Sequence, residues 1–175
     1  MTAPLPKDED ARLNTLFRYQ ILDTLPEQAY DDIVKLAACI CETPISLITF
    51  IDHQRQWFKA RQGLEMAETP RSSAFCAHAI LDPYRTLIVP DVTQDARFAN
   101  NPLVTGDPYI RFYAGTPLLV EDDCSLGTLC VIDRQPRQLS PQQIEALEAL
   151  SRQVVDQLTL RLSLRQIHEE LAQQS

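Results

Sequence analysis

The sequence has few positive charges and no long apolar segment. Its 175 residues include 16 lysines and arginines against 24 aspartates and glutamates, which gives a net charge of −8. A basic surface for nucleic acid or an anionic membrane is therefore not expected. No run of about 18 apolar residues occurs, so no transmembrane helix is predicted. The polar, acidic start lacks the apolar core of a secretory signal, which predicts a cytoplasmic protein.

Motifs of nucleotide binding and of common hydrolases are also absent. The sequence contains no GxxxxGK[ST] loop, no GxGxxG, no HExxH and no GxSxG. The five cysteines are odd in number and have no framework or zinc-site spacing, so we expect free thiols and no bound metal. A hydrophobic content of 45% and a charged content of 23% are those of a globular protein, and the length predicts one domain over residues 1–175.

Hydrophobic periodicity divides the chain into terminal helices and a central set of strands. Helices are predicted over residues 8–20 and from about 26 to 41, the second with a capping box of Thr24 and Glu27. Strands are predicted over 43–52, 56–61, 85–91, 110–120 and 125–133, followed by a helix over 141–173 that begins at a capping box of Ser140 and Gln143. Tight turns between neighbouring strands favour antiparallel pairing, so residues 26–140 predict the core of an α+β domain.

Residues 43–52, TPISLITFID, predict a central strand, because both of its faces are apolar. Ile45, Leu47 and Ile51 lie on one face, and Ile48 and Phe50 lie on the other. The terminal helices are expected on one face of the sheet. A short helix at 73–81 and the long segment 91–109, which is rich in turn formers, would then cap a small-molecule pocket on the other face.

The short helix contains Cys76 and His78, whose residue types suggest a thiol enzyme or half of a metal site. Residues two apart on a helix point about 200° away from each other, so direct pairing of this thiol and imidazole is disfavoured. A metal would need further ligands, for which Cys130 or His53 would have to converge. A buried small thiol is the interpretation that the pattern favours, with catalysis as the alternative.

Trp57, Lys59 and Arg61 share one face of the strand at 56–61. An aromatic ring beside two cations suits an anionic or planar ligand. The simpler interpretation is an amphipathic edge strand whose cations reach solvent, and the pattern favours it.

The final helix has two apolar stripes at coiled-coil spacing. They consist of Leu147, Leu150, Val154 and Leu158, and then Leu160, Leu164, Ile167 and Leu171. The second stripe lies beyond the expected end of the core, so a single helix would expose it to water. The pattern favours a partner helix over packing back onto the first helix of the same chain.

Several stretches together resemble a GAF domain of the kind found N-terminally in bacterial sensor histidine kinases and diguanylate cyclases. They span about residues 9–160 and include ILDTLPEQAYDDIVKLAACICETPISLITFID, RQWFKARQGL with ETPR, FCAHAI, VPDVTQDARFANNPLV, IRFYAGTPL and LGTLCVIDRQPRQLSPQQ. The resemblance implies a GAF/PAS-like fold, with a central antiparallel sheet of five or six strands, helices on one face and a ligand pocket on the other. It also implies a regulatory sensor that binds a small molecule or dimerises, and that signals through its terminal helices.

The sequence departs from the ligand-specific branches of that family. The NKFDE-type motif of cyclic-nucleotide GAF domains is absent, and Ala77 separates the Cys-His pair that bilin-binding GAF domains have adjacent. Free methionine-R-sulfoxide reductases share the fold and would use Cys76. Their other active-site cysteines are expected at 92–109, where none occurs; Cys130 lies on the last strand instead, so we expect this activity to lack a resolving partner.

The sequence therefore predicts a non-enzymatic sensor domain without a cofactor. We expect a parallel homodimer through the first and last helices, coupled to a histidine kinase or diguanylate cyclase output module. A ligand-free dimerisation module and the reductase are the alternatives. The predicted ligand-binding residues lie on the short helix, the long segment and the central strands: Phe75, Cys76, His78, Phe98, Tyr113 and Cys130.

Overall fold

Six antiparallel strands form the centre of the computed structural model, which describes residues 1–174. Their order across the sheet is β3-β2-β1-β6-β5-β4, so the last strand lies beside the first. The prediction of an antiparallel α+β sheet is confirmed. The strands are β1 (Ile45–Ile51), β2 (Arg55–Gln62), β3 (Glu68–Pro70), β4 (Leu87–Val89), β5 (Phe112–Leu119) and β6 (Ser125–Asp133).

The central strand β1 is buried along its whole length, as its apolar sequence predicts. Ile45, Leu47 and Ile51 belong to the core on one side of the sheet. Ile48 and Phe50 belong to the core on the other side. The two predicted faces of this strand are therefore confirmed, and the sheet separates two hydrophobic cores.

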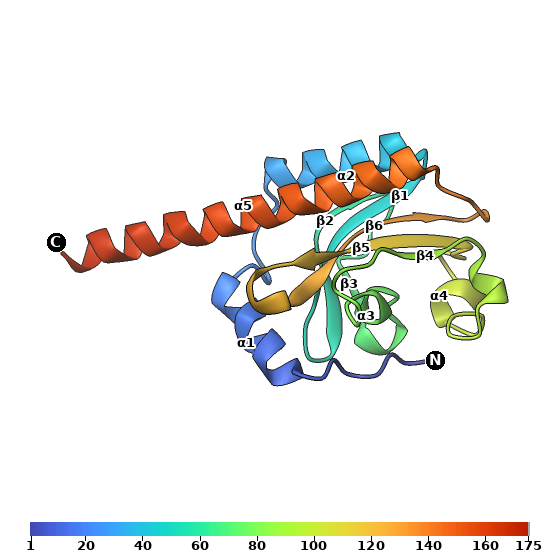
Figure 1. The fold of residues 1–175 in the computed structure, drawn as a ribbon, viewed down its shortest axis with the longest axis horizontal. Helices are drawn as coiled ribbons and strands as arrows, with labels where there is room; N and C mark the ends of the chain where they lie inside the picture. Colours follow the sequence, from blue (N-terminus) through green and yellow to red (C-terminus); the bar gives the residue numbers. More distant parts are fainter. Residues whose placement is uncertain (175) are drawn as a thin grey trace.

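Two long helices, α2 (Gln28–Cys41) and α5 (Pro141–Gln173), lie side by side over one face of the sheet (Figure 1). The predicted capping box at the start of α5 is present, because Ser140 Oγ accepts from Gln143 N and Gln143 Oε1 accepts from Ser140 N. Beyond the sheet, α5 continues as a single projecting helix. No helix within residues 1–174 combines the length and apolarity that a membrane crossing requires.

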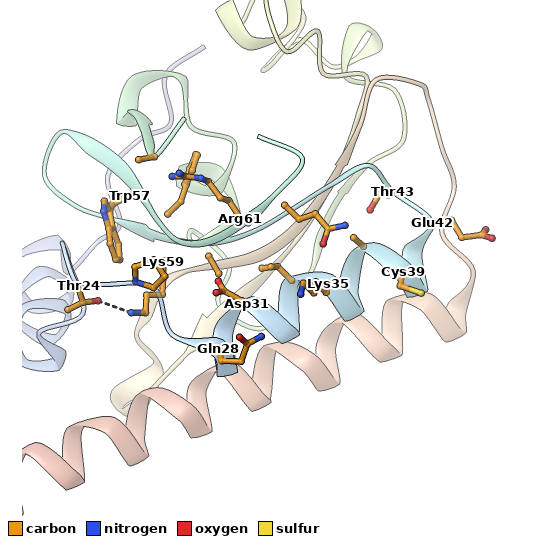
Figure 2. Close-up of a pocket in the computed structure, with 17 residues that line it drawn as sticks. Thr24, Gln28, Asp31, Lys35, Cys39, Glu42, Thr43, Trp57, Lys59 and Arg61 are labelled. Atoms are coloured by element: carbon orange, nitrogen blue, oxygen red, sulfur yellow. Dashed lines mark hydrogen bonds between the residues drawn. The ribbon is translucent and has the colours of Figure 1, made fainter. Parts of the chain in front are cut away.

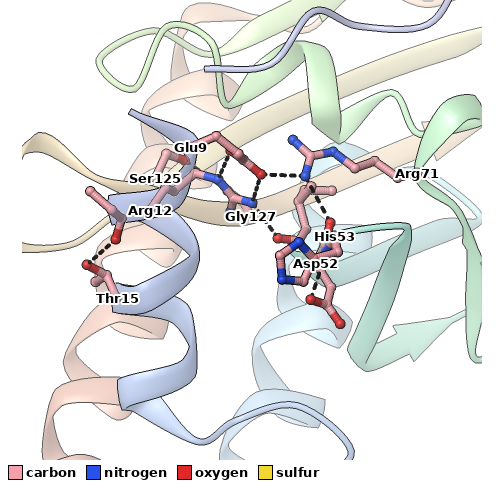
Figure 3. Close-up of polar contacts among 10 residues, drawn as sticks. Glu9, Arg12, Thr15, Asp52, His53, Arg71, Ser125 and Gly127 are labelled. Atoms are coloured by element: carbon pink, nitrogen blue, oxygen red, sulfur yellow. Dashed lines mark hydrogen bonds and ion pairs between the residues drawn. The ribbon is translucent and has the colours of Figure 1, made fainter. Parts of the chain in front are cut away.

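Helix α1 (Glu9–Tyr19) packs beside the ends of β1 and β6, where the buried Arg12 holds it (Figure 3). The Arg12 guanidinium donates to Ile51 O at 2.7 Å and makes two hydrogen bonds with Glu9. Arg71 also reaches Glu9, at 2.5 Å. Burial raises the pKa of Glu9, but the two guanidinium groups outweigh it and hold this pKa below its ordinary value.

The opposite face of the sheet is covered by short elements. They are η1 (Arg71–Ser73), α3 (Cys76–Ala79), η2 (Val92–Gln94) and α4 (Pro102–Thr105). The segment 91–109, predicted to be irregular, thus contains two short helices. Asn101 caps α4 by accepting from Leu103 N, and its amide donates to Ser73 O, which joins the segment to the turn before α3. We call the segment 71–80 with α3 the cap.

Two local predictions are wrong. The first turn of α2 has Glu27 as its N-cap without a side-chain hydrogen bond, because the Thr24 hydroxyl is used elsewhere, between Ile21 O and the Lys59 ammonium. Strand β2 is not an edge strand, because the three-residue β3 pairs with its outer side. The sequence around β3 is charged and short, so it carries no strand pattern.

The third correction concerns Lys59, whose side chain is fully buried rather than reaching solvent. Ile48 pairs with Ala60 and Thr49 pairs with Phe58, so Lys59 is the extra residue of a β-bulge. The bulge turns Lys59 toward the start of α2. There its ammonium donates to Thr24 Oγ1, Leu25 O and Glu27 Oε2, at 2.9, 2.6 and 2.6 Å.

Candidate functional site

Five of the six predicted ligand-binding residues converge in the core between the sheet and the cap. They share one hydrophobic cluster and are at most 3% exposed: Phe75, Cys76, Phe98, Tyr113 and Cys130. Three elements bring them together, because α3 lies over β5 and β6 and the segment after β4 folds back against α3. The sixth residue, His78, lies at the margin of this cluster and is half-buried.

Aromatic rings fill the space that a ligand would occupy between the cap and the sheet. The Phe75 ring stacks on Phe98 with centroids 4.3 Å apart and an interplanar angle of 7°. It also meets Tyr113 at 5.2 Å. The His78 ring approaches Phe98 edge-on at 4.8 Å. The site is therefore closed by its own side chains.

The Cys76 sulfur lies at the centre of a set of buried hydrogen-bond donors. The hydroxyl of Tyr113 donates to it at 3.2 Å, and that of Thr128 at 3.0 Å. Cys130 belongs to the same buried cluster and shares its face of β6 with Thr128. Thr49 Oγ1 lies 3.2 Å from Thr128 Oγ1 and extends the polar cluster to β1. Cys76, Cys130, Tyr113, Thr128 and Thr49 thus form a polar cluster within an otherwise apolar core.

Gly115 explains how the Tyr113 hydroxyl reaches this sulfur. The two residues lie on the same face of β5, and a Cβ at Gly115 would lie 2.0 Å from the Tyr113 hydroxyl oxygen. The phenol ring can therefore lie along the strand only because residue 115 has no side chain.

The polar cluster lowers the pKa of Cys76 and raises the pKa values of Tyr113 and Cys130. Burial raises the pKa of Cys76, but hydrogen bonds from Cys130, Thr128, Thr49 and Tyr113 outweigh it and lower this pKa to about 7. Burial and the charge of the Cys76 thiolate raise the pKa values of Tyr113 and Cys130 well above their ordinary values. The cluster therefore favours a thiolate at Cys76 and keeps the phenol and the second thiol protonated as donors.

His78 does not act on Cys76, as the helical geometry predicted. Its Nε2 lies 3.1 Å from Met1 O, outside the cap. Burial lowers the pKa of His78. Within residues 1–174, no three His, Cys, Asp or Glu side chains converge as a metal site would require.

Of four cavities at the surface of the described residues, none is lined by Phe75, Cys76, Phe98, Tyr113 or Cys130. One of about 630 Å³ involves His78, with Met1 and Arg97. The ligand-binding role of the six residues stays a prediction, since a ligand between cap and sheet would have to displace the aromatic rings.

The largest of the four, about 1110 Å³, is a groove between α2 and β2 on the helix-covered face (Figure 2). Trp57, Lys59 and Arg61 all line it, together with Lys35 and Glu42. The sequence placed all three on one face of the strand, which is wrong for Arg61: it pairs with Leu47, whereas Trp57 pairs with Phe50, and these two partners lie on opposite sides of the sheet. A groove was not predicted there. The sequence did not predict the bulge at Lys59, which determines which side chains of this strand face α2.

A family model for the GAF domain matches residues 25–158, and the chain belongs to this family. The match covers the sheet, α2 and the first half of α5. The prediction of a GAF domain, made from the sequence, is confirmed.

A cyclic di-GMP phosphodiesterase of Pseudomonas aeruginosa is 43% identical over 162 residues. The match covers 91% of this chain but 27% of that protein, so the chain spans about a quarter of the length of this relative. This relative is a signalling protein, which agrees with a regulatory GAF domain.

Solved GAF structures share the fold at low sequence identity. The GAF domain of an Acinetobacter phosphoenolpyruvate-protein phosphotransferase matches with a TM-score of 0.63 and 18% identity, over 89% of this chain and 95% of that one. The PixJ GAF domain of Thermosynechococcus elongatus matches at 0.62 and 16%, over 93% and 94%. The chromophore-binding domain of a bacteriophytochrome from R. palustris matches at 0.64 and 14%, over 92% and 65%.

Proposed function

We propose that the chain is a non-catalytic regulatory GAF module that forms a parallel homodimer through α5 and α1 and controls an output domain. One observation carries this proposal: the projecting part of α5 exposes a stripe of large apolar side chains. Leu160, Leu164 and Ile167 are 54%, 50% and 51% exposed. Their spacings of four and three residues are those of a coiled-coil seam.

The stripe contrasts with the first half of the same helix. Leu147, Val154 and Leu158 are at most 1% exposed, because they pack on the sheet. Beyond them the helix leaves the body of the domain (Figure 1). Exposed apolar side chains in register on one helix favour a second helix as their cover. A parallel pairing brings each position of the stripe against its own copy.

Helix α1 lies close to the base of the stripe, which supports its place in the same interface. Arg161 Nη1 donates to Gln20 O at 3.1 Å, just after the end of α1. Phe17, on α1, is 43% exposed. The end of α1 therefore lies beside the part of α5 where the exposed stripe begins.

The relative supports the signalling role. The P. aeruginosa phosphodiesterase combines a segment 43% identical to this chain with a further three quarters of its own length. By analogy with that phosphodiesterase, we assign the chain the control of an attached or associated enzyme of bacterial signalling. The sequence resemblance predicts a histidine kinase or a diguanylate cyclase as this output module. The free thiols agree with a cytoplasmic location.

Analytical ultracentrifugation tests the dimer. The unmodified chain is expected at twice its mass of 19.9 kDa, and Leu164→Glu at the monomer mass, because the carboxylate would be buried in the seam. Gln166→Glu adds the same charge on the side of the helix away from the stripe and is expected to stay dimeric. An unmodified chain that is monomeric at micromolar concentration would refute the proposal.

Cross-linking tests the orientation of the helices. In a Cys39→Ser background, which removes the exposed thiol, Ile167→Cys is expected to form an intermolecular disulfide on mild oxidation, because parallel pairing places the two copies in contact. Gln166→Cys is the matched control and is expected to cross-link much more slowly. Equal cross-linking at both positions would contradict a parallel seam.

One structural feature favours the reductase alternative, and another argues against it. Contrary to expectation, Cys76 does have a neighbouring thiol, because β6 lies beside β5 and brings Cys130 beneath α3. The site shows no opening for a substrate the size of methionine sulfoxide, since every side chain around Cys76 is buried. We therefore retain the non-catalytic assignment. Reduction of free methionine sulfoxide with a thiol reductant, abolished by Cys76→Ser, would overturn it.

A further inference from the structure

We infer that Cys76 and Cys130 form a redox-active dithiol, which hydrogen peroxide oxidises to a disulfide between the cap and the sheet. The inference goes beyond the proposed dimer and does not depend on it, because the thiols lie on the face of the sheet opposite α2 and α5. It assigns a chemical role to buried groups that the regulatory function leaves unexplained.

The first support is geometric. Cys76 begins α3 and Cys130 lies in the middle of β6, 54 residues later, yet both belong to one buried cluster. Thr128, which shares its face of β6 with Cys130, lies 3.0 Å from the Cys76 sulfur. Both cysteine side chains are at most 1% exposed. A disulfide between these two thiols would attach the cap covalently to the central sheet, against which α3 already packs.

The second support is the division of roles between the two sulfurs. Cys76 receives the hydroxyls of Tyr113 and Thr128, which stabilise a thiolate, the nucleophilic form of cysteine. Cys130 stays protonated, since its pKa is raised well above the ordinary value. The pair thus consists of an attacking thiolate and a resolving thiol.

The reaction needs one molecule of peroxide for each disulfide. The Cys76 thiolate attacks one peroxide oxygen, the O–O bond breaks, and hydroxide leaves and takes a proton to become water. The Cys130 sulfur then attacks the sulfenic sulfur of Cys76, the S–O bond breaks, and hydroxide leaves with the Cys130 proton as a second water. The two thiols lose two electrons, which reduce the peroxide to water.

Access requires only local opening of the cap. Helix α3 is a single turn of four residues, and peroxide is small and uncharged. Short elements of this kind open at lower free energy than the strands beneath them. A larger disulfide reductant or a substrate with a side chain would need more of the cap to unfold.

The chain supplies its own matched control. Cys41 is as buried as Cys76, at 1% exposure, but burial raises its pKa to about 11 and no hydroxyl cluster offsets this. It is expected to resist peroxide. Cys39 and Cys124, which are partly or fully accessible, are replaced by serine in all variants so that they do not react in the place of the pair.

The experiment treats the folded Cys39→Ser, Cys124→Ser protein with hydrogen peroxide and analyses a non-reducing digest by mass spectrometry. The expected product is a Cys76–Cys130 disulfide peptide, with Cys41 still reduced. With Cys130→Ser added, a Cys76 sulfenic acid is expected, trapped by dimedone; with Cys76→Ser added, Cys130 is expected to stay reduced. Oxidation of Cys41 at the same rate as Cys76, or a reduced Cys76 throughout, would refute the inference.

The pH profile distinguishes an activated thiolate from a merely exposed one. A thiol with a pKa of about 7 is about 9% thiolate at pH 6 and about 91% at pH 8. The oxidation rate is thus expected to rise about tenfold over this range and to level off above it. The titratable groups facing the sulfur are Tyr113 from β5 and Cys130 from β6, and both remain protonated here.

Tyr113→Phe removes one donor to the Cys76 sulfur and keeps the ring. Its profile is expected to shift to higher pH, because one hydrogen bond that stabilises the thiolate is lost. Tyr113 acts here as a positioning residue. An unchanged profile in this variant would show that the hydroxyl cluster does not set the reactivity of the pair.

Discussion

Substitution of the buried Lys59 tests how strongly its hydrogen bonds join β2 to the segment before α2. Its ammonium makes three hydrogen bonds, to Thr24, Leu25 and Glu27, and lies 5.1 Å from the centre of the Tyr30 ring. Lys59→Met keeps most of the side-chain volume and removes all three bonds. We expect the free energy of unfolding to fall.

The magnitude follows from the partners that remain. Hydrogen bonds to a charged group contribute about 1.5 to 3 kcal/mol each, but the ammonium also costs several kcal/mol to desolvate. Glu27 is 42% exposed and keeps Arg161 at 3.4 Å, so its carboxylate is not left buried and unpaired. The net loss is therefore about 2 kcal/mol, which corresponds to a fall in Tm of about 4 to 8 °C for a domain of this size.

Urea and thermal unfolding followed by circular dichroism measure this loss, at one fixed protein concentration because the chain is proposed to dimerise. Lys35→Met on the exposed side of α2 removes the same charge and is expected to change stability by less than about 0.5 kcal/mol. A Lys59→Met protein as stable as the unmodified chain would refute the reasoning, because the desolvation cost would then equal the gain from the hydrogen bonds.

The same pair predicts the direction of a pH dependence. Burial raises the pKa of Glu27, but Lys59 and Arg161 outweigh it and hold this pKa below its ordinary value of 4.5. A carboxyl group with a lowered folded-state pKa stabilises the fold above its unfolded pKa, and loses this contribution as the pH falls through the folded value. The difference in stability between the unmodified chain and Lys59→Met is therefore expected to shrink below about pH 4.

Two further substitutions test the sheet and the start of α5. Gly127→Ala is expected to destabilise the fold by about 3 kcal/mol or more in urea unfolding, because its Cβ would lie 1.8 Å from the backbone oxygen of Thr49 on the neighbouring strand; a loss below 1 kcal/mol would mean that the strands separate easily. Ser140→Ala is expected to cost about 1 kcal/mol in the same assay, because it removes the cap that Gln143 N uses. No measurable loss would show that water replaces this cap.

Local sequence patterns predicted the features that depend on near neighbours. The alternation in β1 gave the two faces of the strand correctly, because side-chain period is a property of the strand itself. The capping box at Ser140 is likewise local. A similar pattern at Thr24 failed, because a distant lysine uses its hydroxyl. The sequence within residues 20–30 carries no sign of this competition.

The contacts between the residues of the candidate site could not be predicted without the fold. Cys76, Tyr113 and Cys130 could be grouped from their expected elements, but their contacts depend on the strand order that places β6 between β1 and β5. The glycine that admits the Tyr113 hydroxyl has no distinguishing pattern of its own. The groove beside α2 was missed because it depends on the bulge at Lys59, which only the pairing register reveals.

Arg161 lies where α5 changes from a helix packed on the domain to a helix with an exposed apolar stripe. Its guanidinium contacts Glu27 at the start of α2 and donates to Tyr19 O and Gln20 O at the end of α1. The family match ends at residue 158, one turn earlier, and the side chain at 158 is the last fully buried one on the helix. Arg161 therefore holds α5, α1 and α2 together at one point. We propose that a change in the position of α1 or α2 reaches the exposed stripe through this contact, because α5 continues as one helix from its buried part into the stripe.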